Sequence, residues 1–143
     1  MKRHHHFATL FLRFALAAGF LSAVASRLSL WGVHSSGWKN FLDYTAQVNS
    51  FAPKSAIPFL AIISTVLETS IALLLLIGYK IKLASYAAAI LTLCFALAMT
   101  LSFGIKEAFD YSVFAVSAGA FLLATMPQYN WSIDNLFIKN NKS

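Results

Sequence analysis

Residues 57–78 read IPFLAIISTVLETSIALLLLIG, and Glu68 is the single charged side chain among them. An α-helix rises about 1.5 Å per residue, so about 20 residues cross the hydrocarbon core of a bilayer. This stretch is long enough and apolar enough to do so. We therefore predict a transmembrane helix over 57–78, with one carboxyl group near its middle.

Three further apolar stretches accompany this one, at 7–30, 83–105 and 110–126. The connection Gly78-Tyr79-Lys80-Ile81-Lys82 is short, so the second and third stretches form an antiparallel hairpin. Asp110 is placed to cap the amino end of the fourth stretch. The predicted fold is all-α, an antiparallel bundle of four transmembrane helices in a single domain over 1–143. The residues from Asn130 to Ser143 are expected to form a polar tail with little to order it.

An amphipathic helix is predicted in the long connection between the first two stretches. Its apolar face recurs at helical spacing, and Pro53 ends it. The face comprises Trp38, Phe41, Leu42, Thr45, Val48 and Ala52. Two interpretations stay open: a helix on the outer membrane surface, or a lid over an opening between the transmembrane helices.

The composition fits a membrane protein. Hydrophobic residues make up 59% of the 143 residues and charged residues only 11%, whereas soluble domains carry about 25% charged residues. The net charge is +6, but the basic residues form no patch of the kind that binds nucleic acid. The lone Cys94 excludes an intramolecular disulfide and a CxxC metal or redox pair.

The distribution of Lys and Arg predicts the orientation. Six of them flank the amino terminus, the 78–82 turn and the carboxyl tail, and four lie in the other two connections. Positive residues favour the cytoplasmic side, so both termini are predicted to be cytoplasmic in a multi-pass protein of the cell inner membrane. One alternative stays open, because Lys2-Arg3 followed by an apolar run and Ala23-Val24-Ala25-Ser26 also has the form of a cleaved signal peptide.

Glu68 is the most informative residue of the sequence. An ionised carboxylate in mid-membrane costs at least about 2.5 kcal/mol, so it needs a partner. Counting from the helix ends with the standard rise brings Arg13 within reach, which predicts an intramembrane Arg13–Glu68 ion pair. The pair either fixes the register of two helices or forms a polar centre for a ligand or proton. In a third interpretation, Arg13 extends alone to the inner surface.

A second polar cluster is predicted at the outer end of the bundle. It comprises Arg27, His34, Asp110 and Tyr111, with Lys106 beside them. It is either an entrance or docking surface, or an ordinary solvated loop with a helix cap. His34 alone does not indicate a metal site, since zinc takes three or four ligands. Small residues at Ala15, Gly19 and Ala23 are expected to allow close helix packing.

Three segments together resemble the DoxX family of small bacterial four-helix membrane proteins. The first is FLRFALAAGFLSAV at 11–24 with RLSLWG at 27–32, and the second is Glu68 with LLLLIG at 73–78 and the basic turn. The third runs from Ala98-Met99 through Gly104-Ile105-Lys106 to Asp110-Tyr111-Ser112-Val113-Phe114. The resemblance covers nearly the whole chain, and the order and spacing of the segments make it specific.

The resemblance implies a role beside redox enzymes, because the family is named for a subunit of an archaeal thiosulfate:quinone oxidoreductase. We expect an accessory subunit of a membrane redox complex, with no cofactor in the chain itself but a possible contact with quinone. Arg13, Glu68 and Asp110 are the family positions carried over as functional candidates. Whether the chain is an enzyme stays open. The alternatives are a small transporter component that uses Glu68, or a structural scaffold.

Overall fold

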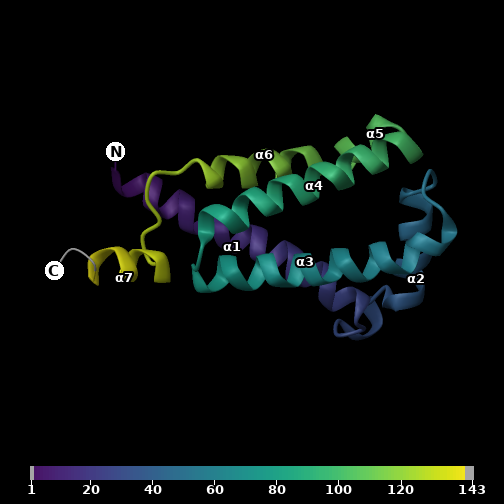
Figure 1. Cartoon of the computed structure of the whole chain (residues 1–143), viewed down its shortest axis with the longest axis horizontal. Coiled ribbons are helices and arrows are strands. Elements are labelled where there is room, and N and C mark those ends of the chain that lie inside the picture. The colour runs from purple at the N-terminus through teal and green to yellow at the C-terminus, as the bar shows by residue number, and fades with distance from the viewer. Residues whose placement is uncertain (1, 141–143) are drawn as a thin grey trace.

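The computed structural model describes residues 2–140, with side chains described for 4–136. Every regular element in this part of the chain is helical (Figure 1). The helices are α1 (Lys2–Arg27), α2 (Gly37–Val48), α3 (Ile57–Ile77), α4 (Ile81–Phe103), α5 (Ile105–Asp110), α6 (Val113–Ala124) and α7 (Ile133–Asn140). Two short 3-10 turns, η1 (Gly32–His34) and η2 (Lys54–Ala56), precede α2 and α3.

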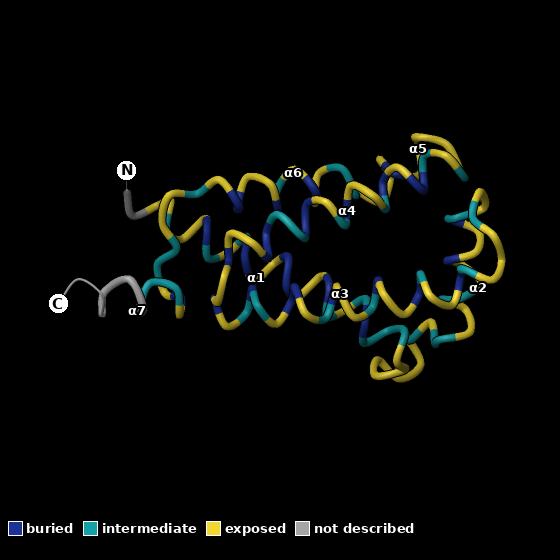
Figure 2. The backbone as a smooth tube through the Cα atoms, viewed as in Figure 1, coloured by how far each residue is buried: buried dark blue, intermediate teal, exposed yellow. Residues whose placement is uncertain are grey.

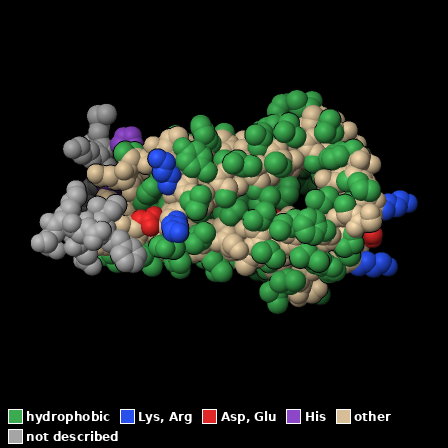
Figure 3. All heavy atoms as spheres, in the orientation of Figure 1, with side chains coloured by type: hydrophobic (Ala, Val, Ile, Leu, Met, Phe, Trp, Pro, Cys, Tyr) green, Lys and Arg blue, Asp and Glu red, His purple; other side chains and the backbone are tan. Residues whose placement is uncertain are grey.

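Three helical segments have the length and composition of membrane spans. They are His4–Arg27, Lys54–Ile77 and Ile81–Phe103, which confirms the first three predicted helices to within a few residues. On the face of the bundle drawn in Figure 3, hydrophobic side chains cover much of the surface, and many large apolar residues are exposed. Such a surface is stable against lipid and unfavourable against water.

The fourth predicted helix, 110–126, differs from the structure. The helix α5 ends at Asp110, and the left-handed Ser112 (φ 55°) separates it from the 12-residue α6. Asp110 therefore does not cap the fourth helix, and that prediction was wrong. Its exposed carboxylate instead pairs with Lys106 one turn earlier in α5, an arrangement that satisfies the charge locally.

The three long helices α1, α3 and α4 and the shorter apolar α6 pack around a shared core. The helix α1 lies along α3, α4 lies along α6, and α3 and α4 form the predicted hairpin (Figure 1). Gly78 turns the chain at the end of α3 with a left-handed φ of 72°, a conformation that glycine adopts without steric cost. Buried residues face inward along these helices and exposed residues face outward (Figure 2). The largest wholly buried apolar side chains are Leu75, Ile81 and Leu123.

The predicted amphipathic helix is present as α2, and it packs onto the bundle. Its predicted end was wrong, because α2 ends at Val48 and Ala52 and Pro53 lie beyond it. Thr45 and Val48 on its apolar face are buried, and Val48 joins a small core with Ala98 and Met99 of α4. The hydroxyl of Ser102 donates a hydrogen bond to the carbonyl of Val48 at 2.6 Å. These contacts hold α2 against α4 at one end of the molecule, and α2 also contacts α3.

The carboxyl-terminal segment is more ordered than expected for a polar tail. The Asp134 carboxylate accepts hydrogen bonds from the backbone N–H groups of Lys80 and Ile81 at 2.8 and 2.9 Å. These donors are free because they begin α4, where no preceding helical turn can bond them. The first turn of α7 is therefore fixed to the α3–α4 turn. The terminal residues 141–143 of the predicted tail lie outside the described part of the chain.

Candidate functional site

A buried ion pair joins α1 and α3. Nη2 of Arg27 donates to Oε1 of Glu68 at 3.0 Å, and Nη1 lies 2.9 Å from Oε2. Glu68 is 1% exposed, and the side chain of Arg27 is 11% exposed. In so apolar a setting each charge depends on the other, since either one alone would be buried without compensation.

Two further side chains hold the guanidinium of Arg27 in place. Nη1 donates to the hydroxyl of Thr65 at 3.2 Å, and the guanidinium carbon lies 3.9 Å from the centre of the Phe41 ring. A cation over an aromatic face gains up to about 2 kcal/mol when water is excluded. Because Phe41 belongs to α2, this helix contacts the ion pair directly.

The predicted Arg13–Glu68 pair is wrong, and the reason is the register of α1 against α3. Arg13 lies at the other end of α3, where its Nη1 is 3.1 Å from the position that a Cβ on Gly78 would occupy. Glu68 lies ten residues from Gly78, which is about 15 Å along the helix. Since the two helices run antiparallel, the residue of α1 that reaches Glu68 comes later in the chain, and that residue is Arg27.

Arg13 has a different environment from the one predicted. It is buried, and its Nη2 donates to the backbone carbonyl of Trp131 at 3.0 Å. It therefore connects α1 to the segment that precedes α7. The sequence estimate failed because it placed the start of the first helix level with Gly78. In the structure Arg13, which is already well inside α1, lies beside Gly78, so α1 extends past that end of α3.

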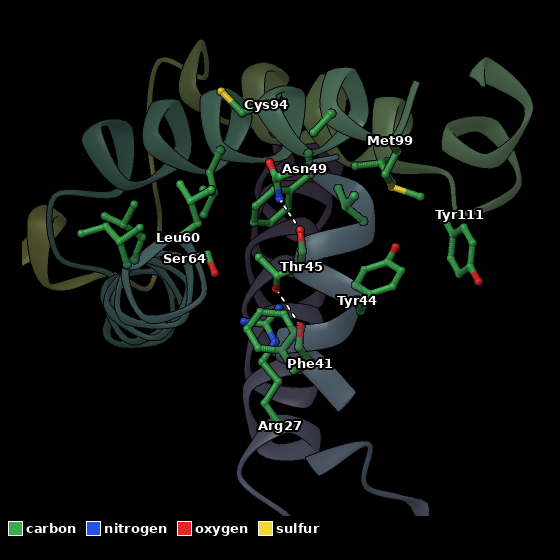
Figure 4. Close-up of a pocket in the computed structure, with 17 residues that line it drawn as sticks. Arg27, Phe41, Tyr44, Thr45, Asn49, Leu60, Ser64, Cys94, Met99 and Tyr111 are labelled. Carbon is green, nitrogen blue, oxygen red and sulfur yellow. Dashed lines mark hydrogen bonds between the residues drawn. The ribbon is translucent and has the colours of Figure 1, made fainter. Parts of the chain in front are cut away.

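A first cavity, cavity 1, lies beneath α2 and measures about 440 Å³. Figure 4 shows Thr45 and Asn49 on the α2 face that lines it, with the Arg27–Phe41 stack nearby and Tyr44 and Tyr111 to one side. Its other walls are largely aliphatic and come from α3 and α4, including Leu60, Ile63, Leu67, Leu91, Ala98 and Met99. A largely apolar cavity with a few hydrogen-bonding groups is typical of a small-molecule site.

A second cavity, cavity 2, measures about 550 Å³. Arg27 and Glu68 line it together with apolar residues of α1, α4 and α6. These are Leu12, Ala15, Leu16, Gly19, Phe20, Ala23, Phe95, Ala115, Val116 and Gly119. Arg27 and Phe95 thus line both cavities, whereas Glu68 lines cavity 2.

The predicted outer cluster is only partly brought together. Arg27 and Tyr111 both line cavity 1. His34 is exposed in η1, and Asp110 is exposed and paired with Lys106, so neither belongs to the cavity. Among the described residues, no three His, Cys, Asp or Glu side chains are grouped so that they could hold a metal ion.

Tyr44 adds a hydroxyl group to the wall of cavity 1. Burial raises the pKa of this phenol above its ordinary value, and the nearby Tyr111 and Glu107 raise it further. The hydroxyl therefore keeps its proton at neutral pH. It is available as a hydrogen-bond donor toward a ligand in the cavity.

Sequence reasoning did not identify Phe41, Thr45, Asn49 and Thr65 as site residues. A signal was present for the first two, because they lie on the apolar face of the predicted amphipathic helix. That face predicted that one side of α2 would be buried. Which helices bury it, α3 and α4, follows only from the tertiary packing. Thr65 lies one turn before Glu68, where a hydroxyl shares its helix face.

No curated protein and no solved structure matches the chain. A family model does match, over residues 24–143, and that family is described as the TQO small subunit DoxD. The resemblance found in the sequence was to DoxX, a related membrane family, so the matching family differs in its exact name. The match spans most of the chain, including all the residues of the ion pair and of α2. This chain is a membrane protein and belongs to the DoxD family.

Proposed function

We propose that this protein is an accessory subunit of a membrane redox complex and that it holds a quinone in cavity 1. The family description names a small subunit, which supports a role beside a larger partner protein. Such a subunit needs no redox cofactor of its own. Its contribution is to position a lipid-soluble electron carrier next to the partner.

The same proposal includes the arrangement in the bilayer. Three helices have the length to span it, and the apolar α6 runs beside α4 and, together with α5, supplies the fourth crossing. Both termini then lie on the cytoplasmic side of the cell inner membrane, as the Lys and Arg distribution indicates. The Arg27–Glu68 pair lies toward the outer end of the bundle in this arrangement.

The observation that carries the quinone proposal is the chemistry of cavity 1. Its walls are mainly aliphatic, which suits a lipid-soluble ring. The Arg27 guanidinium has five N–H donors and has some left after its hydrogen bonds to Thr65 and Glu68. A quinone carries two carbonyl acceptors and no donor. Arg27 and the hydroxyl of Tyr44 can therefore donate hydrogen bonds to the carbonyl oxygens of a quinone in cavity 1. The quinone itself would carry the electrons.

The apolar lining also decides between this proposal and a transporter. Transport of a proton or polar solute through Glu68 needs a hydrated path to one surface. Glu68 is 1% exposed, and its neighbours in cavity 2 are apolar apart from Arg27. This environment favours an apolar ligand.

Quinone binding is measured on the purified full chain in lipid nanodiscs with a decyl-substituted benzoquinone. We expect saturable binding that raises the unfolding temperature, since a ligand bound only to the folded state stabilises it. Thr45→Leu, which places a larger apolar side chain in cavity 1, should abolish this shift. Ala18→Leu on the exposed face of α1 is the matched control and should bind normally. Equal shifts in both variants would exclude cavity 1 as the site.

The accessory role is tested separately by affinity purification in a gentle detergent, followed by identification of the proteins that accompany the chain. Recovery of a redox enzyme in a fixed ratio is the expected result. A chain that is recovered alone and functions without a partner would contradict the role.

A further inference from the structure

Cavity 1 opens to the outside of the bundle between α3 and α4. These two helices lie close together at the Gly78 turn and further apart toward α2 (Figure 1). Where they separate, Ile63 and Leu67 of α3 and Cys94 of α4 line the cavity and are also exposed on the outer surface. Figure 3 shows a hollow between the two helices on this face. These three residues therefore mark the edge of an opening, called here the α3–α4 opening.

The depth of the α3–α4 opening decides what surrounds it. Ile63 and Leu67 lie near the middle of the Lys54–Ile77 span, and Cys94 lies near the middle of the Ile81–Phe103 span. At mid-span a membrane protein is surrounded by hydrocarbon chains, and the lipid headgroups lie at the ends of the spans. The α3–α4 opening therefore connects cavity 1 to the hydrocarbon of the bilayer.

The other exposed edge of cavity 1 has a different chemistry. It lies at the end of the bundle, where Tyr44 and Tyr111 line the cavity and are exposed. A tyrosine with a free hydroxyl group suits the interface between lipid and water. Between the two edges α2 covers the cavity, and it is held by the contact of Phe41 with Arg27 and by the bond from Ser102 to Val48. A hydrocarbon chain therefore has its favourable path through the α3–α4 opening.

Two kinds of hydrocarbon chain compete for this opening: an acyl chain of a phospholipid and the tail of the ligand in cavity 1. The charged headgroup of a phospholipid stays at the membrane surface, so its acyl chain leaves the donors of Arg27 and Tyr44 without an acceptor. An uncharged quinone ring can enter at this depth and accept hydrogen bonds from both donors. The cavity and the opening together fit one molecule, with a compact acceptor ring and a hydrocarbon tail.

We infer that the α3–α4 opening is the binding site for the tail of a quinone with a long hydrocarbon chain, and that this quinone enters cavity 1 from the bilayer. The inference rests on the proposed function. It adds the class of quinone, the side from which the ring enters, and the residues that contact the tail, which are Ile63, Leu67 and Cys94.

The test is photo-crosslinking of the full chain in lipid nanodiscs. The probe is a fully substituted benzoquinone, whose ring has no free carbon for a thiol to add to, with a diazirine in the middle of its decyl tail. After irradiation the modified residues are located by peptide mass spectrometry. A tenfold excess of the same quinone without the diazirine should reduce adducts at a saturable site about tenfold, whereas adducts from probe dissolved in the lipid should not change. We expect the suppressed adducts within 60–67 and 91–98.

A pair of neighbouring substitutions tests the edge of the opening directly. Ile63→Trp places a larger ring at the edge and should weaken binding of the decyl quinone about tenfold, because the tail must be displaced. Ile62→Trp is the matched control, since Ile62 is also exposed on α3 but does not line cavity 1, and its binding should not change. The same ring with a methyl group in place of the tail should bind both variants equally. Melting curves show whether both variants are folded.

The failures of the two proposals can be told apart. If both quinones raise the unfolding temperature but the suppressed adducts lie near Tyr44 and Tyr111, or if Ile63→Trp binds the decyl quinone normally, the tail site is refuted and the proposed function stands. If neither quinone raises the unfolding temperature and no adduct is suppressed, the quinone-linked function fails as well. Equal suppression of the 60–67 and 91–98 adducts by decanol would show that the opening takes any hydrocarbon chain, and would refute a site for the quinone tail.

Discussion

Removal of one partner of the Arg27–Glu68 pair should destabilise the protein in a way that depends on which partner is removed. Arg27→Met keeps the length of the side chain but leaves the Glu68 carboxyl buried without a cation. Glu68→Leu leaves the guanidinium of Arg27 without an anion. The double variant removes both charges and fills the same space with apolar groups.

The expected magnitudes follow from the geometry. At 2.9 Å and an effective dielectric constant near 20, the attraction amounts to about 6 kcal/mol before the cost of burial. In Arg27→Met, the Glu68 carboxyl can stay buried by taking up a proton. Protonating a carboxyl group of ordinary pKa costs about 4 kcal/mol at pH 7 and about 1 kcal/mol at pH 5. The destabilisation by Arg27→Met should therefore shrink as the pH falls. An arginine cannot lose its proton, so Glu68→Leu should cost about 3 kcal/mol at either pH.

The assay is reversible unfolding of the four proteins in mixed micelles with an increasing fraction of dodecyl sulfate, at pH 7 and pH 5. The double variant should be within about 1 kcal/mol of the wild type, which gives a coupling energy of at least about 3 kcal/mol. A second cycle that replaces Arg13 and Glu68 is the control. Its two effects should add, because Arg13 bonds to Trp131 instead. Additive effects of Arg27 and Glu68, or no pH dependence of Arg27→Met, would refute the pairing.

Three further predictions concern the opposite end of the bundle. Gly78→Ala should lower the free energy of unfolding by about 2 kcal/mol or more, because φ is 72° and the new Cβ would lie 2.8 Å from Cβ of Ser132. Gly32→Ala, also at positive φ but with open space, should cost only about 1 kcal/mol in the same unfolding assay. Asp134→Asn weakens two charge-assisted hydrogen bonds, so it should cost about 1–2 kcal/mol and speed proteolysis of the carboxyl-terminal segment; unchanged proteolysis would contradict the docking. Burial raises the pKa of Tyr129, so its neutral form stabilises the fold fully below about pH 10 and this contribution is lost as the pH rises through the folded pKa. Tyr129→Phe should reduce this alkaline loss in melting curves recorded from pH 9 to 11.

The arrangement gives α2 a role that a passive surface helix would not have. Phe41 stacks on Arg27, and Thr45 and Asn49 of the same helix line cavity 1. Movement of α2 away from the bundle would therefore have two effects at once. It would open cavity 1, and it would remove the Phe41 ring from the guanidinium of Arg27. Closure of cavity 1 and fixation of the pair are thus linked through one helix.

Local sequence determined the helices of this protein. Long apolar runs, the Gly78 turn and the periodicity of residues 38–52 are local signals, so the three long spans, the hairpin and the amphipathic helix followed from them. A mid-membrane Glu68 also required a cationic partner on energetic grounds alone. The sequence likewise carried the resemblance to a DoxX-type membrane protein, which the DoxD match supports in its broader sense.

Only the tertiary structure decided which cation pairs with Glu68. Both Arg13 and Arg27 lie on α1, and the choice depends on the register of two antiparallel helices, which a shift of a few turns reverses. That register is set by side-chain packing along the whole α1–α3 contact and by the contact of Arg13 with the Trp131 carbonyl. The two cavities have the same origin, since the space beside Gly19 depends on how far α6 lies from α1. Apolar helices resemble one another in sequence, so only their packing distinguishes a close contact from an opening.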